Sequence, residues 1–118
     1  MGYVKIKARI SNTERTKSKE LELIADTGAI YTAIPENILK SLDIMPKGKR
    51  RFKIADGKIK EFKIGEAYIE IGKEGATSIV AFLEENAMPL LGVTTLELLG
   101  LQVDPVSGEL KPLELFML

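Results

Sequence analysis

The stretch Leu23–Pro35, LIADTGAIYTAIP, guides the interpretation of the whole sequence. An apolar run reaches Asp26, turns through Thr27 and Gly28, and becomes apolar again within two residues. Because Asp and Gly are common in turns, an ordinary turn at the end of a strand is one interpretation. Turns are seldom enclosed by apolar residues on both sides, however. The stretch therefore favours a carboxylate placed for chemistry at the end of a buried strand.

The residue types that the chain lacks restrict its chemistry. Its 118 residues contain no Cys and no His. Their absence excludes disulfides, thiolate zinc sites, and catalysis by Ser-His-Asp or Cys-His groups. Carboxylates, lysines and hydroxyls remain, and we expect neither a metal nor a cofactor.

Length and charge predict one neutral domain. With 118 residues and 45% hydrophobic content, residues 1–118 are expected to form a single domain. Seventeen basic and seventeen acidic residues cancel, so no global field would steer nucleic acid or an acidic membrane. A local basic run at residues 47–53 contains a single aromatic residue and no interleaved aromatic platform, which predicts a solvated strand face.

Apolar segments in the sequence are short. None approaches eighteen consecutive apolar residues, and the first ten residues alternate where a signal peptide would carry an apolar block. We therefore expect a cytoplasmic protein with no membrane partner.

Period-two alternation predicts a mainly β fold. Apolar residues alternate with charged ones over residues 4–10, and the alternation resumes at residues 21–25 after a polar hairpin loop. This return strand delivers Asp26 at its end. A second hairpin is predicted within residues 50–72, with Asp56-Gly57 as a two-residue turn.

Two short helices and a final hairpin complete the expected elements. Pro35 is predicted at the first position of a helix that ends near Leu42, and VTTLELLG has helical spacing with Gly100 as its cap. The remaining strands are expected at residues 67–71, at residues 79–83, and in a hairpin over residues 101–115 that turns at DPVSG.

Three segments resemble the retropepsin-like aspartic proteases. They are LIADTGA at residues 23–29, IADGK at 54–58 and PLLGVTTLELLGL at 89–101, and their order and spacing cover nearly the whole chain. The resemblance implies an all-β fold: a single-lobe acid-protease closed β-barrel with two short helices that assembles as a homodimer.

The chain also departs from the viral members of this family. It begins directly at the strand before the Asp-Thr-Gly hairpin, and Val93-Thr94 stands where the viral proteins carry Arg-Asn or Arg-Asp. Its C-terminus is longer by the DPVSGEL hairpin. The chain therefore looks closer to cellular and prokaryotic members, and we expect Leu110–Leu118 to build much of the dimer interface.

Peptide hydrolysis without metal, thiol or histidine needs one group that deprotonates water and another that protonates the carbonyl oxygen. Two carboxylates within about 3 Å cannot both ionise, so they share one proton and perform both tasks. The sequence has one Asp-Thr-Gly, and Asp43, Asp56 and Asp104 occupy turn-like settings without an apolar lead-in. The second carboxylate then comes from elsewhere in the chain or from a second chain. The resemblance favours Asp26 of a symmetry mate.

The resemblance also implies roles for individual residues. Asp26 is the expected catalytic acid and base, supported by the Thr27 hydroxyl across the twofold axis, by Gly28, and by the small Ala29. The other expected site residues bind substrate from the flap and the cleft: Ala55, Asp56, Gly57, Ile30, Leu90 and Leu91.

The predicted function is that of an aspartic endopeptidase acting on an extended peptide or an unfolded protein. The alternative that stays open is a non-catalytic dimerisation or peptide-binding module with the same fold. Nucleic-acid binding is disfavoured by the neutral charge and the lack of aromatic stacking groups. The distance between Asp26 and its mate would discriminate between the first two.

Overall fold

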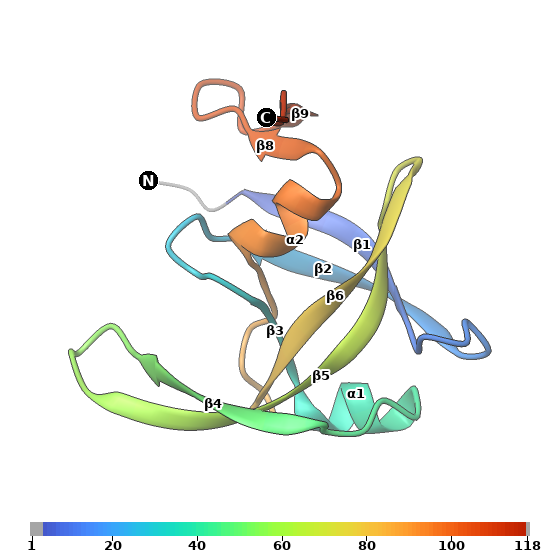
Figure 1. Ribbon diagram of the computed structural model, residues 1–118, viewed down its shortest axis with the longest axis vertical. Coiled ribbons are helices and arrows are strands. Elements are labelled where there is room, and N and C mark those ends of the chain that lie inside the picture. Colours follow the sequence, from blue (N-terminus) through green and yellow to red (C-terminus); the bar gives the residue numbers. More distant parts are fainter. Residues whose placement is uncertain (1–3, 118) are drawn as a thin grey trace.

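Strands dominate the structure, a computed structural model that describes residues 4–117 (Figure 1). Seven strands form one mixed sheet, and the last two form a separate hairpin. The mainly β architecture with two short helices is as expected. The strands are β1 Lys5–Ser11, β2 Ser18–Ala25, β3 Thr32–Pro35, β4 Gly48–Lys53, β5 Ile59–Ile71, β6 Glu74–Leu83, β7 Leu90–Leu91, β8 Leu101–Val103 and β9 Leu110–Pro112, and the helices are α1 Glu36–Ser41 and α2 Val93–Leu98.

The large sheet runs in the order β1-β2-β7-β3-β6-β5-β4. β5 also pairs with β1, and Ile10 of β1 lies opposite Ile69 of β5. The strands from β1 to β5 in this order therefore form a ring in which each strand pairs with the next. β4 lies beyond this ring and pairs with the first half of β5. The β4–β5 hairpin therefore projects from the rest of the molecule as an arm (Figure 1).

The main core lies inside the ring of paired strands. Alternation along β1 buries Ala8 and Ile10 while Lys7 and Arg9 remain exposed, as the sequence predicted. Removing such a side chain from water contributes about 1.5–3 kcal/mol. The largest fully buried apolar side chains are Ile10, Leu23, Ile34, Leu39, Ile69, Val80 and Leu91.

A second, smaller apolar cluster lies beside β3, where the arm meets the ring. Its buried members are Ala33, Ile64 and Ala81. The partly buried side chains packed against them are Phe52, Phe62, Ile79, Leu83 and Leu90.

The hairpin at Asp56-Gly57 has a three-residue loop, so the expected two-residue turn is wrong. The Ile54 N–H donates to the Lys58 carbonyl at 2.9 Å, and the Gly57 N–H donates to the Ile54 carbonyl at 2.9 Å. Gly57 has φ 87°, whereas Asp56 is not among the residues with positive φ. A two-residue turn of type I′ needs positive φ at both positions, and a three-residue loop needs it at the glycine alone.

The helix boundaries are close to those expected. Pro35 has an extended backbone with ψ 138° and caps α1 instead of occupying its first position, because it still pairs with Leu83 of β6. α2 ends as predicted, and Gly100 follows with φ 68°. Neither helix in residues 4–117 is long and apolar enough to cross a membrane.

The C-terminal hairpin is shorter than expected. β8 and β9 pair from Leu101 opposite Pro112 to Val103 opposite Leu110. The Leu113 N–H then donates to the Gly100 carbonyl at 2.8 Å, and the following residues form no strand up to Met117. Leu118 lies outside the described residues.

Candidate active site

The loop after β2 holds Asp26 in a fixed turn. The Asp26 N–H donates to the Leu91 carbonyl at 3.1 Å, and its own carbonyl accepts the Ala29 N–H at 3.0 Å. The carboxylate Oδ1 accepts the Gly28 N–H at 2.9 Å. These bonds orient a half-buried carboxylate toward the surface, where Thr27 and Gly28 are exposed.

A second loop crosses the first at β7. The Val93 N–H donates to the Ala29 carbonyl at 2.9 Å, and the Thr94 N–H donates to the Ile30 carbonyl at 3.0 Å. At the crossing the backbones are so close that a Cβ on Gly92 would lie 2.6 Å from the Thr32 nitrogen. Glycine is therefore required at position 92.

Three buried hydroxyl groups lie next to this crossing and bond to one another. The Gly92 N–H donates to Thr32 Oγ1 at 3.0 Å, and Thr32 Oγ1 lies 2.6 Å from Thr95 Oγ1. Thr95 Oγ1 also lies 2.8 Å from Ser78 Oγ. The cluster links β3, β6 and α2 beneath the Asp26 loop. Its hydroxyls satisfy one another, as buried polar groups must.

A pocket of about 490 Å³ separates the Asp26 loop from the arm. Among the residues that the structure describes, Asp26 contributes the one carboxylate and Lys53 the one cation in its wall. The other lining residues are Gly28, Ala29, Ile30, Tyr31, Ala33, Ile54, Ala55, Phe52, Phe62, Ala81, Leu83 and Leu90.

Aromatic side chains connect the two walls of this pocket. Tyr31 meets Phe52 edge to face with ring centroids 5.8 Å apart, and Phe52 meets Phe62 at 5.6 Å. Such contacts stabilise by about 0.5–1.5 kcal/mol beyond burial. These three residues were not predicted for the site, although Phe52 and Phe62 lie on one face of the β4–β5 hairpin.

The pocket brings together six of the ten residues predicted for the site. Asp26, Gly28, Ala29, Ile30, Ala55 and Leu90 line it. Thr27, Asp56 and Gly57 are exposed outside it. Leu91 is 0% exposed and belongs to the main core, so its assignment to the cleft is corrected. Successive residues of a strand point to opposite faces, and Leu90 takes the pocket side.

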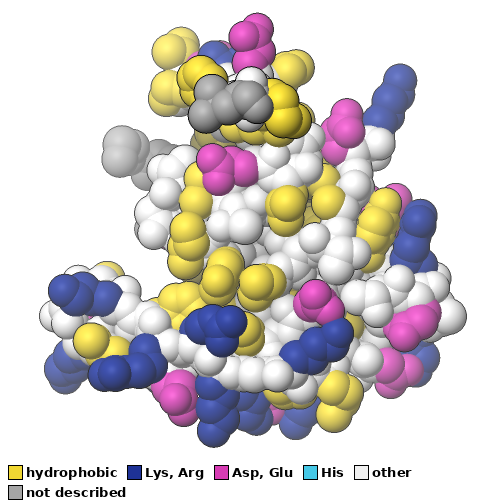
Figure 2. Space-filling model, in the orientation of Figure 1, with side chains coloured by type: hydrophobic (Ala, Val, Ile, Leu, Met, Phe, Trp, Pro, Cys, Tyr) yellow, Lys and Arg dark blue, Asp and Glu magenta, His cyan; other side chains and the backbone are white. Residues whose placement is uncertain are grey.

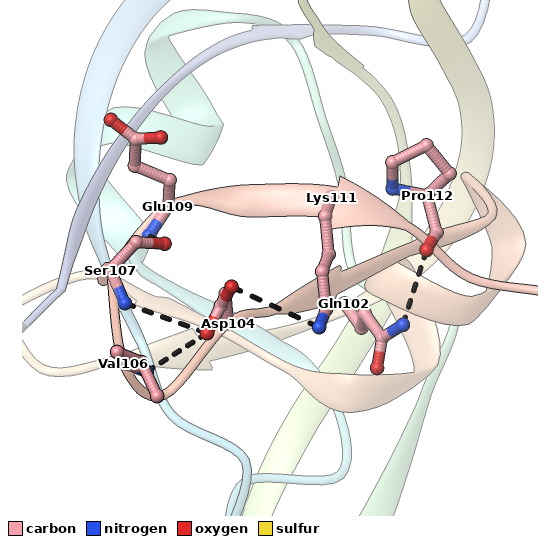
Figure 3. A network of polar contacts seen from close by, with 7 residues as sticks. All are labelled: Gln102, Asp104, Val106, Ser107, Glu109, Lys111 and Pro112. Atoms are coloured by element: carbon pink, nitrogen blue, oxygen red, sulfur yellow. Dashed lines mark hydrogen bonds and ion pairs between the residues drawn. The ribbon is translucent and has the colours of Figure 1, made fainter.

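The other aspartates examined in the sequence lie elsewhere. Asp43 pairs with Lys17 at 2.9 Å, and the Asp56 carboxylate accepts the Lys58 N–H at 2.8 Å. Asp104 organises the C-terminal hairpin (Figure 3). Its carboxylate accepts the Val106 N–H at 2.9 Å, which lowers its pKa, with smaller contributions from the Ser107 N–H and from Lys111. Each carboxylate thus has a structural partner of its own.

Residues 4–117 contain no group of three or more Asp, Glu, His or Cys side chains arranged to hold an ion.

One known protein family matches most of the sequence. Residues 14–101 match the family described as "gag-polyprotein putative aspartyl protease". No curated protein sequence matches significantly.

Solved structures share the fold at low sequence identity. The protease of simian foamy virus (mac) superimposes with a TM-score of 0.56 and 19% identity, covering 79% of this chain and 91% of that one. A retropepsin-like aspartic protease from Rickettsia conorii gives 0.53 and 24%, with 87% and 85% covered.

A longer viral protein contains the same fold. The foamy viral protease–reverse transcriptase, solved with an RNA/DNA hybrid, gives a TM-score of 0.57 and 18% identity. The match covers 96% of this chain and 13% of that protein.

The family match spans most of the sequence, and the foamy virus and Rickettsia proteases share the fold. The chain therefore belongs to the gag-polyprotein aspartyl protease family and has a retropepsin-like fold.

Proposed function

We propose that this protein is an aspartic endopeptidase that hydrolyses peptide bonds with water activated by a pair of Asp26 carboxylates. One observation carries the proposal: Asp26 is the one carboxylate, among the described residues, in the wall of an apolar pocket beneath a projecting hairpin. In this proposal residues 1–118 act as one domain, and the ring of paired strands acts as a closed barrel that holds the loop rigid.

The chemistry requires two carboxylates that share one proton. The ionised carboxylate takes a proton from water, which attacks the peptide carbonyl carbon, while the other carboxyl gives its proton to the carbonyl oxygen. The tetrahedral gem-diol then collapses: the carboxyl that took the water proton gives a proton to the leaving nitrogen as the C–N bond breaks, and the other carboxylate takes a proton back from one of the gem-diol hydroxyls. The pair ends with one proton again, and no cofactor is needed.

The second carboxylate comes from another copy of the chain. No other acid lines the pocket within residues 4–117, and the half-buried Asp26 lies beside the exposed Thr27 and Gly28. Because a twofold axis places the same residue of each chain opposite its mate, one Asp26 per chain suffices. Thr27 would bind across the axis, and Gly28 and Ala29 would leave room for the substrate.

The arm would cover the bound peptide. Ala55, Asp56 and Gly57 form its tip, and Ala55 reaches the pocket wall. Exposed backbone groups at the tip would bind an extended peptide, while Ile30 and Leu90 would contact its side chains.

The C-terminal segment Leu110–Leu118 supplies part of the proposed interface. Phe116 and Met117 are 97% and 94% exposed, and apolar side chains gather around this end of the molecule in Figure 2. Removing Glu114–Leu118 should leave an inactive monomer in sedimentation, because a large apolar patch usually needs a partner. Val106→Ser, on the tip of the same hairpin, is the control that should still dimerise. A truncated chain that remains dimeric would contradict this interface.

An activity assay separates the protease from a non-catalytic binding module with the same fold. The chain is incubated with an unfolded polypeptide between about pH 3 and pH 8. Cleavage should be lost in Asp26→Asn and retained in Asp43→Asn, since Asn tolerates the positive φ of residue 43. The rate should fall at both pH extremes because the pair must hold one proton. Equal behaviour of the parent and Asp26→Asn would favour the binding module.

A further inference from the structure

Charge is distributed unevenly between the arm and the rest of this neutral chain. Residues 47–63 contain eight of the seventeen Lys and Arg residues but two of the seventeen Asp and Glu residues. The remainder of the chain is correspondingly acidic. Figure 2 shows the basic side chains gathered over the region where Figure 1 places β4 and the first half of β5.

Half of these cations have a carboxylate partner. Lys47 pairs with Glu66, Lys49 with Glu61, Lys60 with Glu84 and Lys63 with Glu36. Among residues 4–117, no carboxylate lies within ion-pair distance of the other four, which are exposed. These are Arg50, Arg51, Lys53 and Lys58.

One of the four uncompensated cations adjoins the apolar pocket. Lys53 is part of the pocket wall, next to Phe52 and Ile54. Asp26 lies in the same wall. A ligand in this pocket would therefore meet an apolar surface at its centre and positive charge toward the arm.

Protection of a free sheet edge accounts for part of this pattern. β4 is the outer strand of the sheet, and charged side chains on edge strands prevent pairing with other chains. Such protection works with charges of either sign, however. It explains neither the concentration of one sign on the arm nor the cation in the pocket wall.

We propose that the arm selects acidic substrates: extended peptides in which Asp or Glu residues flank a bulky apolar residue that enters the pocket. This inference rests on the proposed function and names its substrate class. Clustered charges of one sign raise the local concentration of oppositely charged ligands and accelerate their association, and salt weakens the effect.

A nucleic acid is the other polyanion to consider. Single strands bind by stacking bases on open aromatic faces as well as by charge. Phe52 and Phe62 are half-buried and contact each other, and Phe52 also contacts Tyr31. These rings are engaged in the pocket, which favours a peptide.

The test measures binding without catalysis. Full-length Asp26→Asn is titrated with two fluorescent peptides that share an apolar centre and carry either Glu or Lys flanks. The Glu peptide should bind about tenfold more tightly at low salt, and high salt should remove the difference. In an Asp26→Asn background, Arg51→Glu/Lys53→Glu should abolish the preference. The control is Lys19→Glu/Lys73→Glu, which changes the net charge by the same amount but on the β1–β2 and β5–β6 hairpins. This control should retain the preference.

Several results would overturn the inference. One is that the two peptides bind equally, and another is that neither peptide binds. A single-stranded oligonucleotide that binds more tightly than the Glu peptide, and whose binding the same arm substitutions abolish, would also overturn it. Cleavage of a neutral polypeptide by the parent chain tests the protease separately. If the parent chain cleaves nothing but the Glu peptide still binds more tightly, only the proposed protease activity is refuted. If the parent chain cleaves the neutral polypeptide but the two peptides bind equally, only the proposed substrate class is refuted.

Discussion

The two halves of β5 lie in opposite environments although one strand contains both. From Ile64 onward, alternate side chains enter the core, and Ala67 and Ile69 are fully buried between β6 and β1. In residues 59–63 the side chains are exposed apart from the half-buried Phe62, and the strand pairs with β4. One half of the strand therefore stabilises the fold, while the other half is free to project over the pocket.

The two halves of β5 also differ in how many strands support them. The buried half has neighbours on both sides, so opening it would expose core side chains. In the arm, β4 and the first half of β5 pair only with each other, and few of their side chains are buried. Segments of this kind typically open locally at a low cost in free energy. The structure thus combines a well-supported ring of strands that carries the Asp26 loop with an arm that has fewer contacts to the rest of the molecule.

Shortening one side chain in each half of β5 should give the largest difference in stability. Ile69→Ala removes a side chain with 0% exposure, so the free energy of unfolding should fall by about 2–5 kcal/mol. Ile59→Ala, at a position 56% exposed, should change it by less than about 0.5 kcal/mol. Urea denaturation measures both. Equal losses would show that the two halves do not differ as described.

The loop crossing should tolerate no added side chain. Gly92→Ala forces a Cβ against the backbone of Tyr31 and Thr32 and should lower stability by about 1–3 kcal/mol. Peptide cleavage should fall as well, because the Asp26 loop is bonded to this crossing. Gly48→Ala on the arm is the matched control, since its Cβ would meet Ile64 at an ordinary 3.9 Å. A stable and active Gly92→Ala chain would contradict the tight crossing.

Local patterns in the sequence were sufficient for the main strands and for the Asp26 loop. Alternation identified β1 and β2, and Gly100 marked the end of α2. Leu91 could not be separated from Leu90, because β7 has two residues and only its parallel pairing with β2 shows which one points inward.

The composition of the pocket depended on long-range contacts. Phe52 reaches Tyr31 because the β4–β5 hairpin folds back toward the Asp26 loop, and no local pattern encodes that approach. The three-residue loop at the arm tip was missed for a different reason. An Asp-Gly pair suits both loop lengths, and the strand register decides between them.

The buried hydroxyl cluster should have an intermediate effect. Thr95→Val removes the hydroxyl that bonds both Thr32 and Ser78 and should reduce stability by about 1–3 kcal/mol. Thr94→Val, at a half-buried neighbouring position, should be closer to neutral. Thermal unfolding of the two variants tests whether the support beneath the Asp26 loop belongs to the rigid half of the molecule.

The smallest effect should come from pH at the C-terminal hairpin. Because backbone donors lower the pKa of Asp104 in the folded state, its contribution to stability is present above the unfolded pKa and is lost as the pH falls through the folded pKa. Asp104→Asn should therefore lose less stability than the parent when the pH drops below about 4. Melting curves between pH 5 and 2.5 check this, and parallel losses would contradict it.

The shared site is tested most directly by mixing the parent chain with Asp26→Asn under conditions that exchange subunits. If each site needs Asp26 from both chains, mixed dimers are inactive, and an equal mixture should retain about a quarter of the activity of the parent at the same total concentration. If each chain works alone, the mixture should retain about half. A quarter supports the paired carboxylates, and a half would contradict them.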